Sequence, residues 1–349
     1  MAKRLRAAAG WARTHLFAGP WDALVTLALA ALLAAALPPL LRWALWQAQW
    51  SGDAAGCRAA GGACWAFIGE KARFILFGLY PPAEQWRAAL AVGLFLAMAG
   101  YSAARFRLPA AGWALTAAAC GGLLAGGVAG LPAVPATQWG GLPLTLLLTV
   151  LGLAGAFPLA LLLALGRRSR LPVLRALCAG YVELVRGVPL VSVLFMASVM
   201  LPLLLPGGVV IDKLVRAQLA IVLFVAAYMA EAVRGGLQAV PEGQDEAASA
   251  LGLRWWQRQR YVVLPQALRV ALPALVGIAI GTFKDTSLVV VIGLFDLMTS
   301  ARAALADPRW LGFSAEAYLF TGTLYFVLAY ALSRYGRALE ARLAAGEGE

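Results

Sequence analysis

The chain has 349 residues, of which 62% are hydrophobic and 13% are charged, and its mean hydropathy is +0.78. A soluble domain carries about a quarter charged residues, so this composition excludes a single water-soluble core and indicates a multi-spanning helical membrane protein. The formal net charge of +12 therefore indicates Lys and Arg kept on the cytoplasmic side rather than a nucleic-acid partner, and the single histidine argues against a histidine-based metal site or catalytic triad.

Uncharged apolar runs predict an all-α integral membrane protein with eight spans. The predicted spans cover residues 23–41, 88–104, 111–130, 142–165, 173–205, 215–235, 269–294 and 317–335. Residues 108–166 carry no charge and are too long for one span. The segment 131–135 divides them, because its two prolines remove helix donors and clash with the preceding turn.

The distribution of Lys and Arg sets the predicted orientation. These residues gather in alternate connecting segments, which the positive-inside rule places in the cytoplasm together with both termini. The loop 42–87 is then periplasmic. It contains Cys57 and Cys64, for which a disulfide is chemically sensible in an oxidising compartment, and two free thiols are the alternative.

The segment 240–265 lies between two predicted spans on the inner side. Pro241 suits a helix start and Gly252 suits the end of that helix. A second short helix is predicted from Arg254 to Tyr261, ending before Pro265. The pattern predicts a helix–turn–helix that lies along the membrane face and offers small alanines to another protein.

The same segment carries a motif. It runs Glu246-Ala247-Ala248, three residues, Gly252, nine residues, and then Val262-Val263-Leu264-Pro265. This resembles the "EAA" loop of ABC importer permeases, with Val262 at the position of the usual isoleucine. The resemblance implies that the loop is the coupling helix that docks on the ATPase. The implied coupling residues are Gly243, Asp245, Glu246, Ala247, Ala248, Gly252, Leu264 and Pro265.

No phosphate-binding loop accompanies this motif in the sequence. A Walker A loop needs Gly-Lys followed by Ser or Thr, and none of the four lysines stands in that context. The chain is therefore predicted to be no enzyme itself and to carry no cofactor, while a partner ATPase dimer binds ATP and Mg²⁺.

Three further segments extend the resemblance. Residues 181–190, 234–236 and 284–288 are similar to permeases of polar amino-acid importers of the histidine, glutamate, glutamine, arginine and opine type. Residues 136–349 would form a five-helix type I importer core. Residues 1–135, an added block with a cysteine-containing outer loop, resemble the larger permease of general L-amino acid importers.

This resemblance implies an assembly in the bacterial inner membrane. Besides the lipid bilayer and the ATPase dimer, it implies a different second permease, making a heterodimer, and a periplasmic amino-acid-binding protein.

Ionisable residues within predicted spans are candidates for substrate contact, because charge is costly in a membrane. The break expected at 187–189 puts two of them beside a helix end, where transporters build sites. We hypothesise that Glu183 and Asp285 contact a substrate ammonium group and that Arg186 or Lys284 contacts the carboxylate. The neutral hydrogen bonds would come from Thr286 and Ser287.

The alternative is structural, in which these charges pair with one another and hold the helices in register. For Glu231 and Arg234, one turn apart near the inner end of a span, we expect a structural ion pair.

Together these features predict the permease of an ATP-driven importer for polar amino acids that works by alternating access. Alternatives are an importer of another small polar solute or an ion-coupled secondary transporter, although the repeated halves typical of the latter are not evident. A membrane enzyme would need a nucleophile–base pair or a metal cluster, and the sequence offers neither.

Overall fold

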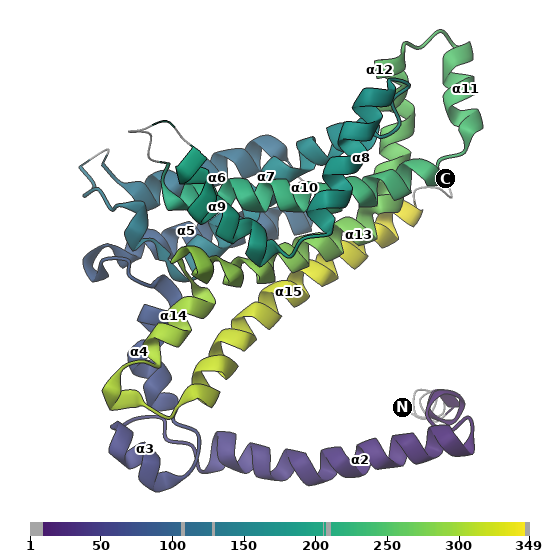
Figure 1. Cartoon of the computed structure of the whole chain (residues 1–349). Coiled ribbons are helices and arrows are strands. Elements are labelled where there is room, and N and C mark those ends of the chain that lie inside the picture. Colours follow the sequence, from purple (N-terminus) through teal and green to yellow (C-terminus); the bar gives the residue numbers. More distant parts are fainter. Residues whose placement is uncertain (1–9, 106–108, 128–129, 205, 207–210, 346–349) are drawn as a thin grey trace. The chain divides into compact units, whose positions relative to one another are not determined.

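The computed structural model describes residues 10–105, 109–127, 130–204, 206 and 211–345 (Figure 1). Within these ranges the chain is helical except for turns and one two-residue strand, β1 (Phe295–Asp296). The all-α membrane fold is thereby confirmed.

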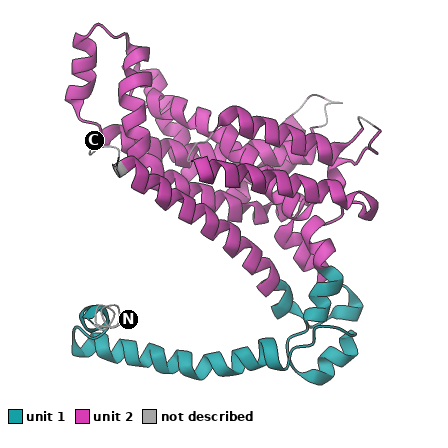
Figure 2. Cartoon of the chain, turned by 180° about the vertical axis from the view of Figure 1, so that it is seen from behind, with its two compact units in different colours: residues 1–71, 307–317 teal, residues 72–306, 318–349 magenta. Residues whose placement is uncertain are grey.

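The chain divides into two compact units (Figure 2). Unit 1 comprises residues 1–71 and 307–317, and unit 2 comprises residues 72–306 and 318–349. Two helices run from one unit into the other, α4 (Trp65–Phe77) and α15 (Ser314–Ala345). The structural boundary differs from the predicted functional division at residue 135, because residues near 310 pack with the N-terminal part.

Unit 1 contains α2 (Pro20–Leu41), the π-helical turn η1 (Arg42–Trp46), α3 (Ala54–Ala60) and the 3-10 turn η6 (Pro308–Trp310). Helix α2 buries none of its residues within the described chain. Asp53 starts α3 by accepting a hydrogen bond from the Gly56 N–H at 2.9 Å. A disulfide joins Cys57 in α3 to Cys64 just before α4.

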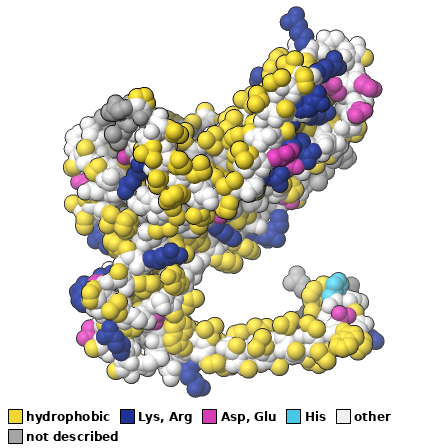
Figure 3. Space-filling model, viewed as in Figure 1, with side chains coloured by type: hydrophobic (Ala, Val, Ile, Leu, Met, Phe, Trp, Pro, Cys, Tyr) yellow, Lys and Arg dark blue, Asp and Glu magenta, His cyan; other side chains and the backbone are white. Residues whose placement is uncertain are grey.

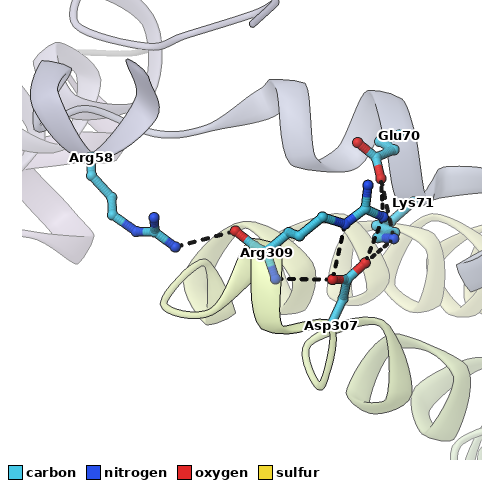
Figure 4. Close-up of polar contacts among 5 residues, drawn as sticks. All are labelled: Arg58, Glu70, Lys71, Asp307 and Arg309. Carbon is cyan, nitrogen blue, oxygen red and sulfur yellow. Dashed lines mark hydrogen bonds and ion pairs between the residues drawn. The ribbon is translucent and has the colours of Figure 1, made fainter. Parts of the chain in front are cut away.

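A charged network ties the two parts of unit 1 together (Figure 4). The Lys71 ammonium lies 2.6 Å from Asp307 Oδ2, and Arg309 Nη2 lies 3.0 Å from the same oxygen. Arg309 Nη2 also lies 3.2 Å from Glu70 Oε1. Arg58 donates to the Arg309 carbonyl at 3.2 Å. These contacts connect segments far apart in the sequence, so the segment after α14 is held by residues of α3 and α4.

Replacing Asp307 with Ala is expected to release this connection, because Lys71 and Arg309 lose their shared acceptor. Hydrogen exchange of residues 305–313 in the assembled complex should quicken about tenfold. Asp22→Ala, on exposed α2 in the same unit, should leave it unchanged. Unchanged exchange in both variants would contradict a role for the network.

The pH dependence of this connection follows from the same contacts. Hydrogen bonds from Arg309 and Lys71 hold the pKa of Asp307 well below its ordinary value. A depressed pKa gives stability that is present above the unfolded pKa and lost only as pH falls through the folded one. The protection factors of residues 305–313 in the unsubstituted chain, which compare each exchange rate with the intrinsic rate at the same pH, should therefore be the same at neutral and mildly acidic pH.

Unit 2 is a bundle of long helices. It contains α5 (Gln85–Arg105), α6 (Ala110–Ala125), α7 (Gly141–Gly166), α8 (Pro172–Arg186), α9 (Leu190–Leu204), α10 (Lys213–Ala239), α11 (Glu242–Ala250), α12 (Trp255–Arg258), α13 (Leu264–Asp285) and α14 (Leu297–Ala304). Its short turns are η2 (Pro82–Glu84), η3 (Ala136–Gln138), η4 (Gln259–Val263) and η5 (Thr286–Ile292).

Small residues let the central helices of unit 2 approach closely. A Cβ at Gly152 of α7 would stand 2.9 Å from the Ile221 side chain of α10, and one at Gly236 would stand 2.1 Å from the Ala267 carbonyl of α13. Close backbone packing of this kind holds membrane helices together without a hydrophobic driving force. Helices α7, α10 and α13 therefore form the scaffold of the unit.

Six helices among the described residues are long and apolar enough to cross a membrane, or up to seven if the bent pair α8–α9 counts as one span. That pair bends by 102° between Arg186 and Leu190, so the predicted break at 187–189 is confirmed.

The predicted count of eight spans depends on α6. With 16 residues this helix is about 24 Å long, short of a ~30 Å bilayer core. It ends earlier than predicted because Gly126 and Gly127 take positive φ, before the prolines of 131–135. Residues 128–129 and 205 of the predicted spans lie outside the described residues, and the count of eight stays a prediction.

Candidate functional site: the 240–265 loop and the charges beneath it

Helix α11 has a well-defined start and end. Its N-terminal turn carries Glu242 and Asp245, whose negative charges interact favourably with the positive end of the helix dipole. Its C-terminus is a Schellman motif, in which Gly252 at φ +78° donates to the Ser249 carbonyl at 2.9 Å and Leu253 donates to the Ala248 carbonyl at 3.2 Å. The predicted helix start at 241–242 and the glycine stop are confirmed.

The second helix of the loop does not end before Pro265, and that prediction is wrong. Helix α12 passes through the π-helical turn η4 directly into α13, and the apolar helical stretch runs from Trp255 to Ile292. Pro265 sits in the first turn of α13, where a missing N–H costs little. The loop is thus one end of a continuous helical rod.

Two polar contacts fix α11 to this rod. Arg258 Nε lies 3.2 Å from Asp245 Oδ1, and Gln266 Nε2 donates to Gln244 Oε1 at 3.4 Å. The outer surface of α11 is left open. Glu246, Ala247 and Ser249 are exposed, and Leu251 is 82% exposed, whereas Ala248 is buried. Because the side chains around this exposed leucine are short, a docking partner can approach the helix closely.

Five charged residues join the ends of α7 and α8 to α10. Glu231 Oε2 of α10 lies 2.8 Å from Arg167 Nη1, at the end of α7, and 3.6 Å from Arg186 Nη1 of α8. Arg234 donates to Glu231 from Nε at 3.0 Å, which confirms the structural ion pair expected there. Arg167 also approaches Glu183 Oε1 at 3.6 Å.

Two of the predicted substrate residues are therefore already paired with protein charges. Glu183 keeps 71% of its side chain exposed and Arg186 keeps 40%. The guanidinium of Arg186 also lies over the Tyr228 ring, 5.6 Å from its centre.

The other four predicted substrate residues lie together at the far end of α13, and no contact between the described residues joins them to Glu183 or Arg186. Lys284 is exposed and Asp285 is half-buried. Apart from the charge of neighbouring Lys284, Asp285 has no ion pair or hydrogen bond from its side chain within the described chain. The buried Thr286 hydroxyl donates to the Phe283 carbonyl at 2.7 Å, and Ser287 is half-buried.

Comparison with known families decides the class of the chain. The family described as "Binding-protein-dependent transport system inner membrane component" matches residues 156–345, which include α8 to α15 and the loop between α10 and α13. The chain belongs to this family. It is a multi-pass membrane permease, with the type I importer permease fold that the sequence predicts.

Two relatives match the permease along nearly its whole length. "Inner membrane amino-acid ABC transporter permease protein YhdY" of Escherichia coli (strain K12) is 45% identical, over 96% of this chain and 93% of its own. "Glutamate/glutamine/aspartate/asparagine transport system permease protein BztC" of Rhodobacter capsulatus is 36% identical, over 95% of this chain and 93% of its own.

One solved structure matches the permease in fold. It is titled "Crystal structure of an amino acid ABC transporter with histidines", and its matched chain is 32% identical, with a TM-score of 0.51. The match covers 58% of this chain and 91% of that one.

Family membership establishes the kinds of protein with which the permease works. Such a membrane component works with an ATPase and a substrate-binding protein and is not itself an enzyme, as the sequence predicts.

Several contacts of the candidate site could not be read from the sequence. Arg167, Gln244 and Arg258 stand in ordinary loop or helix-end positions, and their partners are between 13 and 64 residues away. The cluster of arginines at 167–170 is the one sequence signal that could have drawn attention to Arg167.

Replacing Glu231 with Gln is expected to destabilise the permease, because three guanidinium groups lose the carboxylate between them. Loss of one partner of a buried ion pair costs about 3–5 kcal/mol, and partial exposure of this cluster reduces the figure to about 2 kcal/mol. Thermal unfolding of the purified complex should show a lower Tm.

The double variant Glu231→Gln/Arg234→Gln is the matched test of this pairing. It should recover part of the lost stability, because one of the uncompensated charges is removed. An unchanged Tm for Glu231→Gln alone would show that the cluster does not brace these helices.

Proposed function

We propose that the chain is the permease subunit of an ATP-driven importer that moves polar L-amino acids across the inner membrane by alternating access. The supporting observation is the match along almost the entire chain to two permeases whose names specify amino acids. It includes the N-terminal residues that the family match leaves out, so the likeness extends beyond the transport core.

In this proposal α11 is the element that the ATPase moves. Glu246, Ala247 and Gly243 form the docking surface together with exposed Leu251, and Gly252 sets the angle at which α11 leaves the rod. A shift of α11 acts on Arg258 and Gln266 through the contacts of Asp245 and Gln244. Leu264 and Pro265 stand at the start of α13, where the motion enters the membrane.

The continuous rod from Trp255 onward carries that motion to the far end of α13. There Asp285 would hold the substrate ammonium group, and Lys284 its carboxylate, with Ser287 adding a neutral hydrogen bond. A half-buried carboxylate that lacks an ion-pair partner in the described chain supports this assignment, since an unpaired membrane charge is costly unless a ligand compensates it. Thr286 contributes by fixing the turn after α13.

Glu183 and Arg186 already contact other charged residues of the chain. We propose that they line the inward exit of the pathway, where their exposed faces meet the substrate while Arg167 and Glu231 hold them in place. Substrate contact and helix pairing, which the sequence offers as alternatives, are in this proposal both made by the same two residues.

The proposed assembly has a different permease as the second membrane subunit, an ATPase dimer below and an amino-acid-binding protein outside. Both termini face the cytoplasm, residues 1–135 are an accessory block with the 42–87 loop outside, and residues 136–349 are the transport core. The disulfide between Cys57 and Cys64 supports an oxidising outer compartment for that loop.

The test is ATP hydrolysis by the purified complex in lipid, with its co-purifying subunits and outside binding protein, against a panel of amino acids. Stimulation by a set of polar amino acids is the expected result. Stimulation only by another small polar solute would change the substrate class. Uptake that follows an ion gradient, with no co-purifying ATPase, would replace the proposal by the secondary-transporter alternative.

A further inference from the structure

A groove of about 960 Å³ lies within unit 2, between the 240–265 loop and the junction of α7 with α8. Figure 3 shows basic and acidic side chains gathered over this end of the unit, where α8, α11 and α12 lie. The coupling proposal uses Asp245, Glu246 and Arg258 from its lining, but it assigns no ligand to the groove.

The lining of the groove has an apolar part and an aromatic part. Leu162, Leu163 and Leu174 form a leucine patch, and Leu162 is 62% exposed. Trp255 and Trp256 also line the groove and make edge-to-face contact, with ring centres 4.3 Å apart. Tryptophan prefers the headgroup level of a bilayer, and exposed leucines beside it match the start of an acyl chain.

The polar walls of the groove carry opposite charges. Arg168 and Arg170, between α7 and α8, form a basic wall, and Arg170 makes no ion pair or side-chain hydrogen bond within the described chain. Glu242 and Glu246 of α11 form an acidic wall and are likewise unpaired among the described residues. The remaining charged pair, Asp245 with Arg258, is internally neutral.

From this arrangement we infer that the groove binds one phospholipid whose headgroup carries both a phosphate and a primary ammonium, as phosphatidylethanolamine does. Arg168 and Arg170 receive the phosphate through charge-assisted hydrogen bonds. Glu242 receives the ammonium, and the leucines cover the upper acyl chain. The lipid thereby occupies the space between the coupling helix and the membrane helices that the helix moves.

The charges of the two walls distinguish this ligand from its rivals. A purely anionic lipid leaves the acidic wall unpaired, and a trimethylated headgroup cannot donate hydrogen bonds to it. A free phosphate or amino acid leaves the leucine patch exposed to water. Only the placement of the groove at the cytoplasmic leaflet rests on the proposed function.

The test is native mass spectrometry of the purified importer complex, titrated separately with phosphatidylethanolamine, phosphatidylcholine and phosphatidylglycerol of identical acyl chains. We expect phosphatidylethanolamine to be retained about tenfold more tightly, the factor that one lost hydrogen bond to a charged group gives. Arg170→Gln should weaken the retention of phosphatidylethanolamine by about the same factor. Glu242→Gln should reduce the difference in retention between phosphatidylethanolamine and phosphatidylglycerol.

The matched control is Arg175→Gln, which removes an exposed cation of α8 that does not line the groove, and it should retain the lipid as the unsubstituted chain does. Equal retention of the three lipids, or undiminished retention by Arg170→Gln, overturns the inference. Loss of the ATPase subunit from Arg170→Gln also overturns it, since the groove is then a protein-docking surface. The readout needs no transport, so it fails or succeeds independently of the amino-acid assignment.

Discussion

Replacing Glu246 with Ala and Gly252 with Val in one chain is expected to weaken strongly the stimulation of ATP hydrolysis by substrate. Glu246 supplies an exposed carboxylate on α11. Gly252 takes φ +78°, and a β-branched side chain costs about 1–2 kcal/mol there. The Schellman end of α11 is then lost, so the helix no longer leaves the rod at the angle that docking requires.

The measurement is ATP hydrolysis by the reconstituted complex with binding protein and amino acid. Stimulation should fall at least about tenfold, which corresponds to ~1.4 kcal/mol of lost coupling. Ser249→Ala is the control, because this exposed position belongs to the same helix and its backbone contacts remain. Undiminished stimulation in the double variant would show that α11 is not the element through which the ATPase acts.

Features set by neighbouring residues could be predicted from the sequence. The break between α8 and α9 follows from Gly187 and Pro189, and the end of α11 follows from Gly252. The ion pair of Glu231 with Arg234 needs only one helical turn. In each case the cause and the structural effect lie within a few residues, so local propensity is sufficient.

Features set by distant packing could not be predicted. The rod through α12 and α13 depends on a π-helical turn that accommodates Pro265 without a break, and a proline alone suggests a stop. The contact of Lys71 with Asp307 joins residues 236 positions apart. The sequence of neither segment indicates that it contacts the other. For this reason unit 1, which combines residues 1–71 with 307–317, differs from the predicted block of residues 1–135.

The candidate substrate residues illustrate the same distinction. Glu183 and Asp285 are equal candidates from the sequence, because each is a charged residue within a predicted span and a charge there is energetically costly. Whether a protein partner compensates that cost is decided by packing. Glu183 has Arg167 beside it, whereas the side chain of Asp285 has no ion pair or hydrogen bond among the described residues. The structure therefore makes Asp285 the stronger candidate of the two.

Replacing Asp285 with Asn is expected to abolish uptake while the complex still assembles. The amide keeps the shape of the side chain but cannot neutralise an ammonium group. Loss of a charged hydrogen bond at about 1.5–3 kcal/mol, together with the lost attraction, predicts roughly hundredfold weaker transport at low substrate. Uptake into vesicles and co-purification of the ATPase give the two readouts.

Thermal stability separates substrate contact from a structural role for Asp285. Since the carboxylate has no ion-pair partner in the described chain, removing its charge should leave Tm unchanged or raise it, because an uncompensated membrane charge disappears. Asp22→Asn, the same change on exposed α2, should affect neither uptake nor Tm. Lost uptake together with a lowered Tm would assign Asp285 to the structure of the helix end, and unchanged uptake would remove it from the substrate pathway.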